Sequence, residues 1–256
     1  MAHSLVLVDG HMSTGAEARI SALDPAVLLG VSVFETLPVI EKKPLNLDRH
    51  LLRLSRSASQ IGLELPDLDL IQREVHQLIA RFGPTARLRI TLTGGGHRIL
   101  WAQALDLSRF GRPVRVQTRR FSESPLSQAK HGSRAPWYFA VKESGVDELI
   151  WVSQSGELME GTSSAIIGVR EGGLYCAPNN ASVLPSISRA CILDQAHERG
   201  LRITRRGPRL ASVWDGLYLC SSLRGLAPIY QIDGLSRAVW EPIGRALSKE
   251  LWPWSS

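Results

Sequence analysis

The chain has 256 residues and carries 30 basic against 24 acidic side chains, a formal net charge of +6. Hydrophobic residues make up 44% and charged residues 21%, proportions that exclude a disordered chain and suit a folded protein with a sizeable core. No apolar run approaches the roughly 18 residues of a membrane span, and no secretory signal is visible. The sequence therefore predicts a cytoplasmic protein without a membrane segment.

The cysteines, histidines and basic residues narrow the chemistry further. Three widely spaced cysteines fit neither a disulfide framework nor a metal-binding pair, and the seven histidines form no metal motif, so no metal site is expected. Five of the 30 basic residues are lysines, and the arginines are scattered along the chain. This pattern is typical of a solvated surface, so no nucleic-acid partner is expected, and a non-enzymatic basic binding protein is the remote alternative.

The first part of the chain predicts three strands and two helices. Alternating apolar residues indicate the strands, and apolar residues at helical spacing indicate the helices, which end at glycines. The strands are expected at 4–8, 31–40 and 86–93. One helix is expected at 51–62, and a second from a cap at Asp67 or Asp69 to Gly83.

The second part of the chain mixes strands and helices without regular alternation, which favours an α+β fold over a doubly wound sheet. Strands are expected at 113–118, 148–152, 165–169, 173–176, 217–220 and 229–232, and helices at 137–143, 188–199 and 239–251. The polar segment 122–133 shows no clear period and marks a junction. We therefore expect an N-terminal α/β domain at 1–111, a linker at 112–125 and a larger C-terminal domain at 126–256.

Lysine scarcity allows a test for Schiff-base chemistry, because such an enzyme needs one desolvated amine. Lys42 and Lys43 lie in a predicted turn, and Lys249 lies on the last predicted helix. Lys142 stands at a charged helix end, where a solvated surface lysine is the better interpretation. Lys130 lies at the predicted junction, where cofactor clefts form. Position alone leaves Lys130 as the better of two candidates.

Six motifs in family order carry a resemblance to a known family. They are Gly30–Thr36, His50–Leu54 with Ser57-Ala58, Ala129–His131, Asp147-Glu148 with Glu160–Ser164, Leu184–Arg189, and Ser221–Leu223 before Ala227–Ile229. Together they resemble the class IV aminotransferases, the fold-type IV enzymes that use pyridoxal 5'-phosphate. The resemblance implies a small N-terminal α/β domain, a larger cofactor-binding domain with a pseudo-barrel, and a homodimer.

The resemblance also implies roles for single residues. Lys130 would bind the cofactor covalently and move the proton at the substrate Cα. Glu160 would pair with the pyridine nitrogen, where a carboxylate keeps the ring protonated as an electron sink. Arg53 would hold the phosphate; an ordinary surface role remains open for Glu160 and Arg53.

A second set of residues would complete the anion sites. The backbone N–H groups of Ile187 and Ser188 and the Ser188 hydroxyl would bind phosphate at a helix N-terminus, with Ser222 and the Leu223 amide as further donors. Ser188 could otherwise be an ordinary N-cap. Either Arg98 or Arg224 would bind a substrate carboxylate, because an arginine fork matches that group; both could equally be surface residues.

Details of these motifs leave two activities open. The spacing from Lys130 to Arg134 and the loop Cys220–Leu223 are similar to 4-amino-4-deoxychorismate lyase, which releases 4-aminobenzoate and pyruvate in folate synthesis. In contrast, Leu174-Tyr175 resembles D-amino-acid aminotransferases, and a class IV aminotransferase acting on D- or branched-chain amino acids with 2-oxoglutarate is the alternative. Ser186 replaces the usual glycine of its turn, so we expect Ser186 to adopt a glycine-like backbone conformation.

Overall fold

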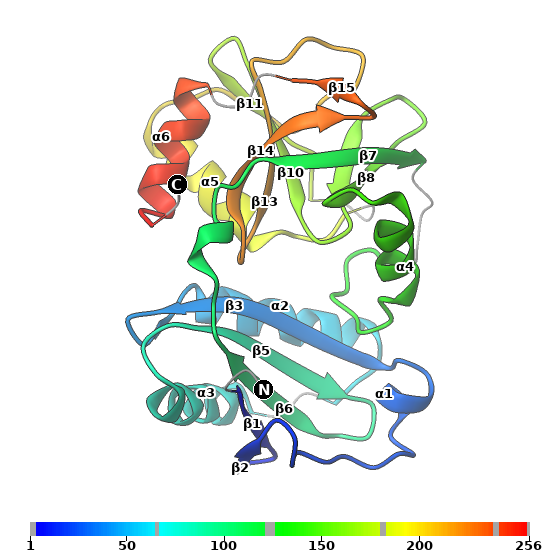
Figure 1. The fold of residues 1–256 in the computed structure, drawn as a ribbon, viewed down its shortest axis with the longest axis vertical. Coiled ribbons are helices and arrows are strands. Elements are labelled where there is room, and N and C mark those ends of the chain that lie inside the picture. The colour runs from blue at the N-terminus through cyan, green and yellow to red at the C-terminus, as the bar shows by residue number, and fades with distance from the viewer. Residues whose placement is uncertain (1–3, 65–66, 121–125, 180–182, 238–240, 255–256) are drawn as a thin grey trace. The chain divides into compact units, whose positions relative to one another are not determined.

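The computed structural model describes residues 4–64, 67–120, 126–179, 183–237 and 241–254 (Figure 1). The chain divides into two compact units. The first unit comprises Met1–Asp106 and Gln128–Arg134, and the second comprises Leu107–Ser127 and Ala135–Ser256. The chain therefore leaves the first unit, returns to it for a short segment that contains Lys130, and leaves it again.

A six-stranded antiparallel sheet forms the first unit, in the order β2-β1-β6-β5-β3-β4. Along one central strand Leu88 and Ile90 are fully buried, while Arg87 and Arg89 alternate with them on the other face. The strands are β1 (Ser4–Val8), β2 (His11–Thr14), β3 (Ser32–Ile40), β4 (Lys43–Pro44), β5 (Ala86–Thr93) and β6 (Arg98–Gln103).

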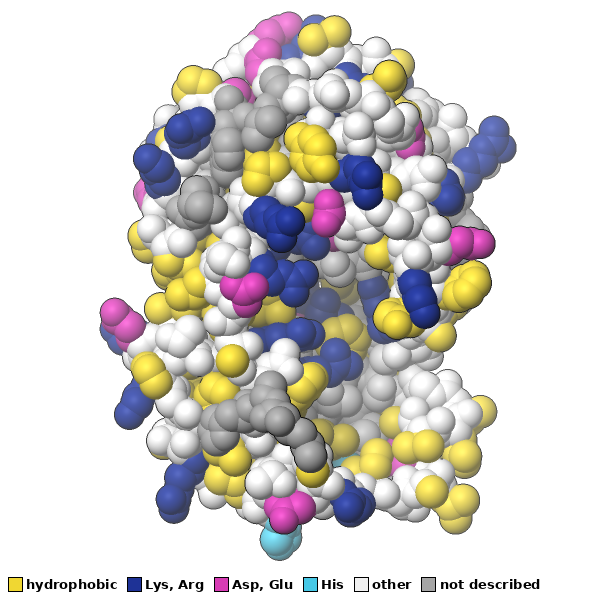
Figure 2. All heavy atoms as spheres, viewed as in Figure 1, with side chains coloured by type: hydrophobic (Ala, Val, Ile, Leu, Met, Phe, Trp, Pro, Cys, Tyr) yellow, Lys and Arg dark blue, Asp and Glu magenta, His cyan; other side chains and the backbone are white. Residues whose placement is uncertain are grey.

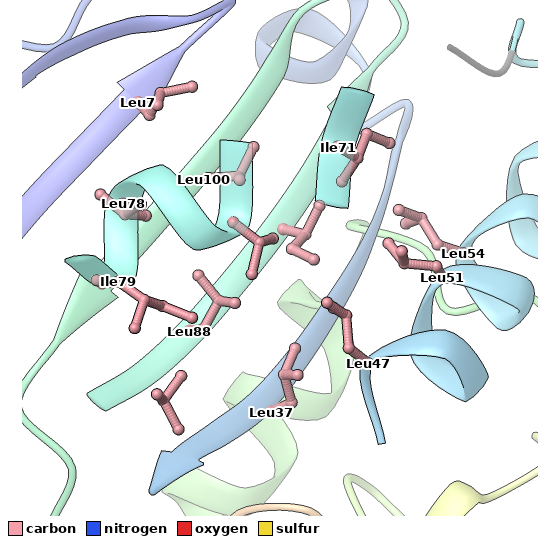
Figure 3. Packing of buried hydrophobic residues seen from close by; sticks show 14 of the residues in the cluster. Leu7, Leu37, Leu47, Leu51, Leu54, Ile71, Leu78, Ile79, Leu88 and Leu100 are labelled. Carbon is pink, nitrogen blue, oxygen red and sulfur yellow. The ribbon is translucent and has the colours of Figure 1, made fainter. Parts of the chain in front are cut away.

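Two amphipathic helices, α2 (Leu47–Gln60) and α3 (Leu68–Phe82), pack on this sheet. Figure 3 shows helix side chains such as Leu54 and Ile71 directed toward Leu88 and Leu37 of the strands. These side chains are fully buried, and burial of apolar area is the main stabilising contribution to the unit. A short helix, α1 (Pro25–Leu28), precedes β3. The helices thus cover one face of the sheet.

A closed barrel forms the second unit. Its six strands follow the order β10-β13-β14-β7-β8-β9, and β9 pairs again with β10. The pairs β14–β7 and β7–β8 are parallel, and the others in the ring are antiparallel. The strands are β7 (Val114–Arg120), β8 (Glu148–Val152), β9 (Leu158–Gly161), β10 (Ala165–Arg170), β13 (Gly216–Ser221) and β14 (Gly225–Ile232), with β11 (Gly173–Tyr175), β12 (Ile203–Thr204) and β15 (Leu235–Ser236) outside the ring.

Three helices accompany the barrel strands. They are α4 (Ala135–Ser144), α5 (Ile187–Glu198) and α6 (Pro242–Leu251), and a single 3-10 turn spans Leu107–Arg109. Helix α5 contacts β10 and β13, and α6 contacts α5 and β14. The side chain of Glu241 caps α6 by accepting a hydrogen bond from the Ile243 N–H at 2.7 Å. In the described part of the chain, no helix is long and apolar enough to span a membrane.

The predicted α+β fold is confirmed, but the contacts divide the chain differently from the predicted boundaries. Half of the predicted linker 112–125 is strand β7, which pairs with β8 and β14 and buries its apolar residues Val114 and Val116 in the barrel core. Residues 121–125 of that linker lie outside the described residues. The segment Gln128–Arg134, predicted in the C-terminal domain, packs in the first unit.

Candidate active site

Lys130 is held by hydrogen bonds of its own peptide group. Its N–H donates to Ser57 Oγ at 3.0 Å, and its carbonyl accepts from the Phe34 N–H at 2.9 Å. The following residues continue along β3, where the Gly132 N–H donates to the Ser32 carbonyl at 2.7 Å. The helix and the strand of the first unit therefore fix the backbone of Lys130, although the flanking chain belongs to the second unit.

The Lys130 side chain is half-buried, and its amine is the desolvated end. Burial and the positive charge of Arg53 together lower the pKa of the amine to about 7, although the negative charge of Glu35 opposes the shift. The amine lies 4.9 Å from the centre of the Phe34 ring. Near neutral pH a large share of the amine is therefore unprotonated, as a nucleophile or base must be.

A buried charge cluster lies beside this lysine. Glu35, fully buried on β3, accepts hydrogen bonds from Arg53 Nε and Nη2 at 2.7 Å each, and His50 Nδ1 lies 2.6 Å from its Oε2. Burial disfavours the charged carboxylate, yet Arg53 and His50 outweigh burial and lower the pKa of Glu35 to about 2. Burial in turn lowers the pKa of His50. The predicted phosphate residue Arg53 is thus committed to a bidentate ion pair, and its phosphate role stays a prediction.

The sequence reasoning did not select Arg89, which lies on β5. Its guanidinium stacks 3.8 Å from the centre of the Phe34 ring, the same ring that Lys130 approaches. Burial lowers the pKa of Arg89 to about 10, and the positive charges of Arg87 and Arg134 add to the shift. The alternation of arginines with buried leucine and isoleucine in β5 was the signal available in the sequence, because it places these arginines on one face.

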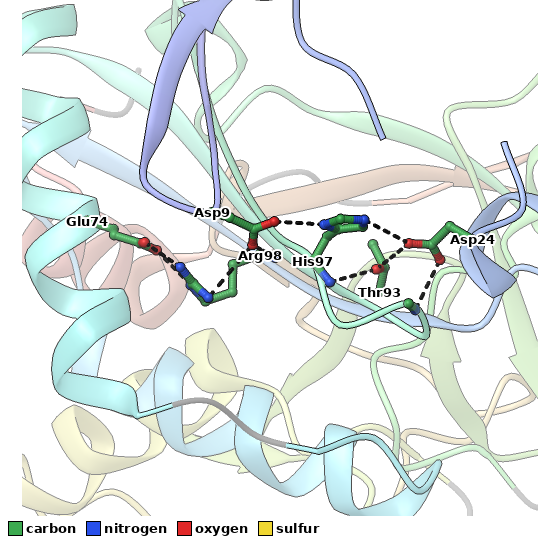
Figure 4. A network of polar contacts seen from close by, with 7 residues as sticks. Asp9, Asp24, Glu74, Thr93, His97 and Arg98 are labelled. Carbon is green, nitrogen blue, oxygen red and sulfur yellow. Dashed lines mark hydrogen bonds and ion pairs between the residues drawn. The ribbon is translucent and has the colours of Figure 1, made fainter. Parts of the chain in front are cut away.

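Arg98 lies in an ion-pair network of the first unit. Its guanidinium donates to both oxygens of Glu74, at 3.1 and 2.8 Å, and Nη1 lies 3.7 Å from Asp9 (Figure 4). In the same network, His97 Nδ1 lies 2.7 Å from Asp9. Glu74 is buried on α3, so the pair joins that helix to β6. The guanidinium of Arg98 thus already binds a carboxylate of the protein. Its role in binding a substrate carboxylate stays a prediction.

In the second unit, Glu160 lies half-buried on β9. Its Oε2 accepts a hydrogen bond from the Leu184 N–H at 3.0 Å. Because Leu184 immediately precedes the turn into α5, this bond connects the carboxylate with the start of that helix. Glu160 and the predicted phosphate residues of α5 therefore belong to one connected region of the second unit.

Helix α5 begins at Ile187, and Ser186 is its N-cap. The Ser186 hydroxyl accepts a hydrogen bond from the Arg189 N–H at 3.2 Å, so the open alternative that Ser188 is the N-cap is wrong. Ser186 has a φ of −76°, and the expected glycine-like shape is absent at this residue. Ile187 and Ser188 are buried in the first turn, where backbone N–H groups lack partners within the helix.

The remaining predicted residues lie in the turn between β13 and β14. Ser222 and Leu223 occupy this turn, which the Arg224 N–H closes by donating to the Ser221 carbonyl at 3.2 Å. Arg224 Nη2 lies 3.7 Å from the buried carboxylate of Glu148. Its predicted substrate role stays a prediction, beside a structural contact within the barrel.

Glu148 belongs to one of the six sequence motifs, and in the structure it supports a loop of the barrel. Its carboxylate accepts hydrogen bonds from the Ser163 N–H at 2.6 Å and the Ser164 hydroxyl at 2.9 Å. A side chain at Gly161 would bring a Cβ within 2.4 Å of the same carboxylate. Glu148 therefore shapes the loop that follows Glu160.

An antiparallel sheet with helices on one face, followed by a six-stranded mixed barrel, is the α+β architecture of fold-type IV. The sequence pattern of the amino-transferase class IV family matches residues 32–232. The chain belongs to the class IV aminotransferase family, and it is an enzyme that uses pyridoxal 5'-phosphate.

Individual relatives agree with this assignment. A bifunctional aminodeoxychorismate lyase / D-amino acid transaminase of Mycobacterium tuberculosis is 25% identical over 269 residues, covering 90% of this chain and 91% of that protein. The branched-chain aminotransferase of Thermoproteus uzoniensis has a similar fold, with a TM-score of 0.87 at 21% identity over 96% of this chain and 92% of that one. An aminotransferase of Brucella abortus bound to pyridoxal phosphate gives a TM-score of 0.86 at 18% identity over 99% of both chains.

Proposed function

We propose that the enzyme is a 4-amino-4-deoxychorismate lyase, which converts its substrate into 4-aminobenzoate and pyruvate. The observation that carries the proposal is the grouping around Phe34 in the first unit. There the Lys130 amine, with a pKa of about 7, and the Arg89 guanidinium approach the same ring. The substrate is a ring that bears two carboxylates, and this grouping supplies a base, an aromatic surface and cations.

The first unit would supply the reacting amine and the substrate cations. Lys130 would bind the cofactor covalently and act on the substrate. Arg89 and Arg134 would bind substrate carboxylates. Burial and neighbouring positive charges, that of Arg134 among them, lower the pKa of Arg89, and a bound anion would offset these effects. Arg98 and Arg224 stay candidates for binding a substrate carboxylate. Arg89 is a further candidate, because it lies beside the same aromatic ring as Lys130.

The second unit would supply neutral donors and one carboxylate. Glu160 would pair with the pyridine nitrogen of the cofactor. The N–H groups of Ile187 and Ser188 suit its phosphate, because the start of an α-helix favours an anion. Ser222 and the Leu223 amide would be further donors to the phosphate. The sequence motif also predicts Arg53 as a phosphate-binding residue. Amine, carboxylate and anion site are the three groups that this cofactor requires, so the residues present fit it.

In the proposed lyase reaction, Lys130 would carry out one proton transfer. When bound, pyridoxal phosphate withdraws electrons from the substrate Cα. Lys130 would remove the Cα proton, the bond between the ring carbon and the enolpyruvyl oxygen would break, and the ring would become aromatic. The leaving enolpyruvate would take up a proton and become pyruvate. A base whose pKa lies near the working pH is suited to this step.

A transaminase acting on D- or branched-chain amino acids is the second candidate. The same amine would take the Cα proton and deliver it to the cofactor, with 2-oxoglutarate as amino acceptor. The mycobacterial relative, whose name combines lyase and D-amino acid transaminase, favours keeping this candidate. A homodimer and a small-molecule substrate complete the proposal. On the face drawn in Figure 2, basic side chains are mixed with hydrophobic and acidic ones, which does not favour the remote alternative of a nucleic-acid-binding protein.

One experiment separates the two activities. The holoenzyme is incubated with 4-amino-4-deoxychorismate alone, and separately with D- or L-amino acids plus 2-oxoglutarate. Equal amounts of pyruvate and 4-aminobenzoate without an acceptor are expected. Oxo-acid formation that requires 2-oxoglutarate, with no pyruvate from the first mixture, would contradict the lyase and favour the transaminase.

A further inference from the structure

The segment that carries Lys130 is a short return of the chain into the first unit. The residues before Gln128 and after Arg134 belong to the second unit. A lysine side chain has a flexible four-carbon stem, so the position of its amine depends on where its backbone is fixed. The contacts of this segment with the first unit therefore decide where the amine is presented.

Two of these contacts reach the peptide group of Lys130 itself. The Phe34 N–H donates to its carbonyl, and the Ser57 hydroxyl accepts from its N–H at 3.0 Å. The Phe34 contact comes from the backbone, so almost every residue type would retain it. Ser57 contributes a side chain, and that side chain is fully buried on α2. The Ser57 hydroxyl is thus the contact with this peptide that one substitution can remove.

The same helix carries the charges that act on the Lys130 amine. Arg53 lies one turn before Ser57 on α2 and lowers the pKa of the amine, and Glu35, its partner, raises it. A hydrogen bond from Ser57 to the lysine backbone ties the amine to the helix that holds this ion pair. A shift of the backbone would change the distances between the amine and both charges, and with them the pKa.

We propose that Ser57 is a positioning residue for Lys130, an inference that rests on the proposed role of Lys130 as the cofactor-binding lysine. Ser57 touches no reacting atom; it fixes the peptide from which the amine extends. A correctly placed amine reacts far faster than one displaced by an ångström, and a displacement of that size costs up to about 100-fold in rate.

The test compares four holoenzymes: wild type, Ser57→Ala, Ser57→Thr and Ser59→Ala. Ser59 lies on the same helix and is exposed, so it provides a matched control for the loss of a serine hydroxyl. For each protein, kcat and KM are measured for the activity that wild type has, and the visible absorbance of the bound cofactor is titrated with pH. Thermal unfolding of each protein is recorded in parallel.

We expect Ser57→Ala to lower kcat by about 10-fold to 100-fold with little change in KM, and to move the pH midpoint of the visible band. Ser57→Thr keeps the hydroxyl and should restore both quantities toward wild type, while Ser59→Ala should match wild type. Ser57→Cys provides a second variant if Ser57→Ala does not fold, because a thiol is a weaker acceptor of similar size and should give an intermediate loss.

Three results would overturn the inference. A Ser57→Ala enzyme with the wild-type kcat and pH midpoint would show that the hydroxyl does not position the lysine. Lower thermal stability with an unchanged midpoint and kcat would assign Ser57 a merely structural role. Reduction of the wild-type holoenzyme with borohydride, followed by peptide mapping, tests the proposed role of Lys130 separately from that of Ser57. Cofactor on a residue other than Lys130 would overturn the proposed site and the role of Ser57 together.

Discussion

The two units handle charge in different ways. In the first unit a full ion pair is buried: Glu35 with Arg53 and His50, beside an amine whose pKa is lowered to about 7. In the second unit Glu160 binds a backbone N–H, and the start of α5 presents N–H groups and a buried Ser188. A buried charge requires a countercharge close by, whereas a buried backbone N–H requires only a hydrogen-bond acceptor. In the proposed function, the first unit would control an amine, and the second would bind an anion with neutral groups.

The largest expected effect comes from removing the amine. Lys130→Ala should lower activity by about 1,000-fold, because a positioned acid–base group contributes roughly 100-fold to 10,000-fold. Steady-state kinetics of the purified enzyme measures the loss. Lys142→Ala is the matched control, since Lys142 is exposed on α4. Equal activity of the two variants would remove Lys130 from the mechanism.

Removing the buried carboxylate should mainly affect stability. Glu35→Gln would leave Arg53 buried without its anion, a change that costs about 3–5 kcal/mol of unfolding free energy. Denaturant unfolding at pH 7 measures this loss, with the exposed Glu64→Gln as control.

The pH dependence of the same residue has a defined sign. The pKa of Glu35 is lowered from 4.5 to about 2, so its contribution to stability is present above pH 4.5 and is lost as the pH falls toward 2. Wild type should therefore lose more stability over this interval than Glu35→Gln. Parallel acid-unfolding curves for the two proteins would contradict the account of the first unit.

In the second unit, Glu160→Gln should lower kcat by about 10-fold to 100-fold, the value of one charge-assisted hydrogen bond. The Leu184 N–H keeps an oxygen acceptor in this variant, so the start of α5 should stay in place and the cofactor should still bind. Kinetics and the cofactor content of the purified variant check both parts. Loss of the cofactor with normal kcat for the remaining holoenzyme would contradict the role of Glu160.

The smallest expected effect separates two arginines of the first unit. Arg89→Gln should raise KM by about 10-fold, because a charge-assisted contact with a substrate carboxylate is lost. Arg98→Gln should lower thermal stability instead, since Arg98 binds the buried Glu74. Measuring KM and Tm for both variants gives the comparison. The opposite pattern would restore Arg98 as the substrate residue.

Periodicity was sufficient for most elements, short strands such as β8 (Glu148–Val152) included, and insufficient for a few. The strand at 86–93 and the helix that ends at Gly83 carry clear patterns, and the structure has β5 at Ala86–Thr93 and α3 at Leu68–Phe82. Strand β6 (Arg98–Gln103) follows three glycines and mixes charged with apolar residues, so its pattern was not recognised. Its inward Arg98 is stabilised by a tertiary ion pair that a local pattern does not contain.

The candidate site was predictable as a set of motifs and unpredictable as a set of contacts. The sequence motifs selected Lys130, Arg53 and Glu160, but the pairing of Arg53 with Glu35 joins residues on different elements. The sequence also did not indicate that Lys130 belongs to the first unit, because its hydrogen bond to Ser57 links residues far apart in the chain. Such long-range contacts depend on the packing of α2 on the sheet, which no single segment specifies.

The most direct test of the account is the residue that carries the cofactor. The holoenzyme is reduced with borohydride, digested, and its peptides are mapped by mass spectrometry. We expect one labelled site, Lys130. We also expect the wild-type enzyme to show a visible absorption band before reduction, and Lys130→Ala to lack this band. Cofactor attached to Lys142 or to any other lysine would contradict it.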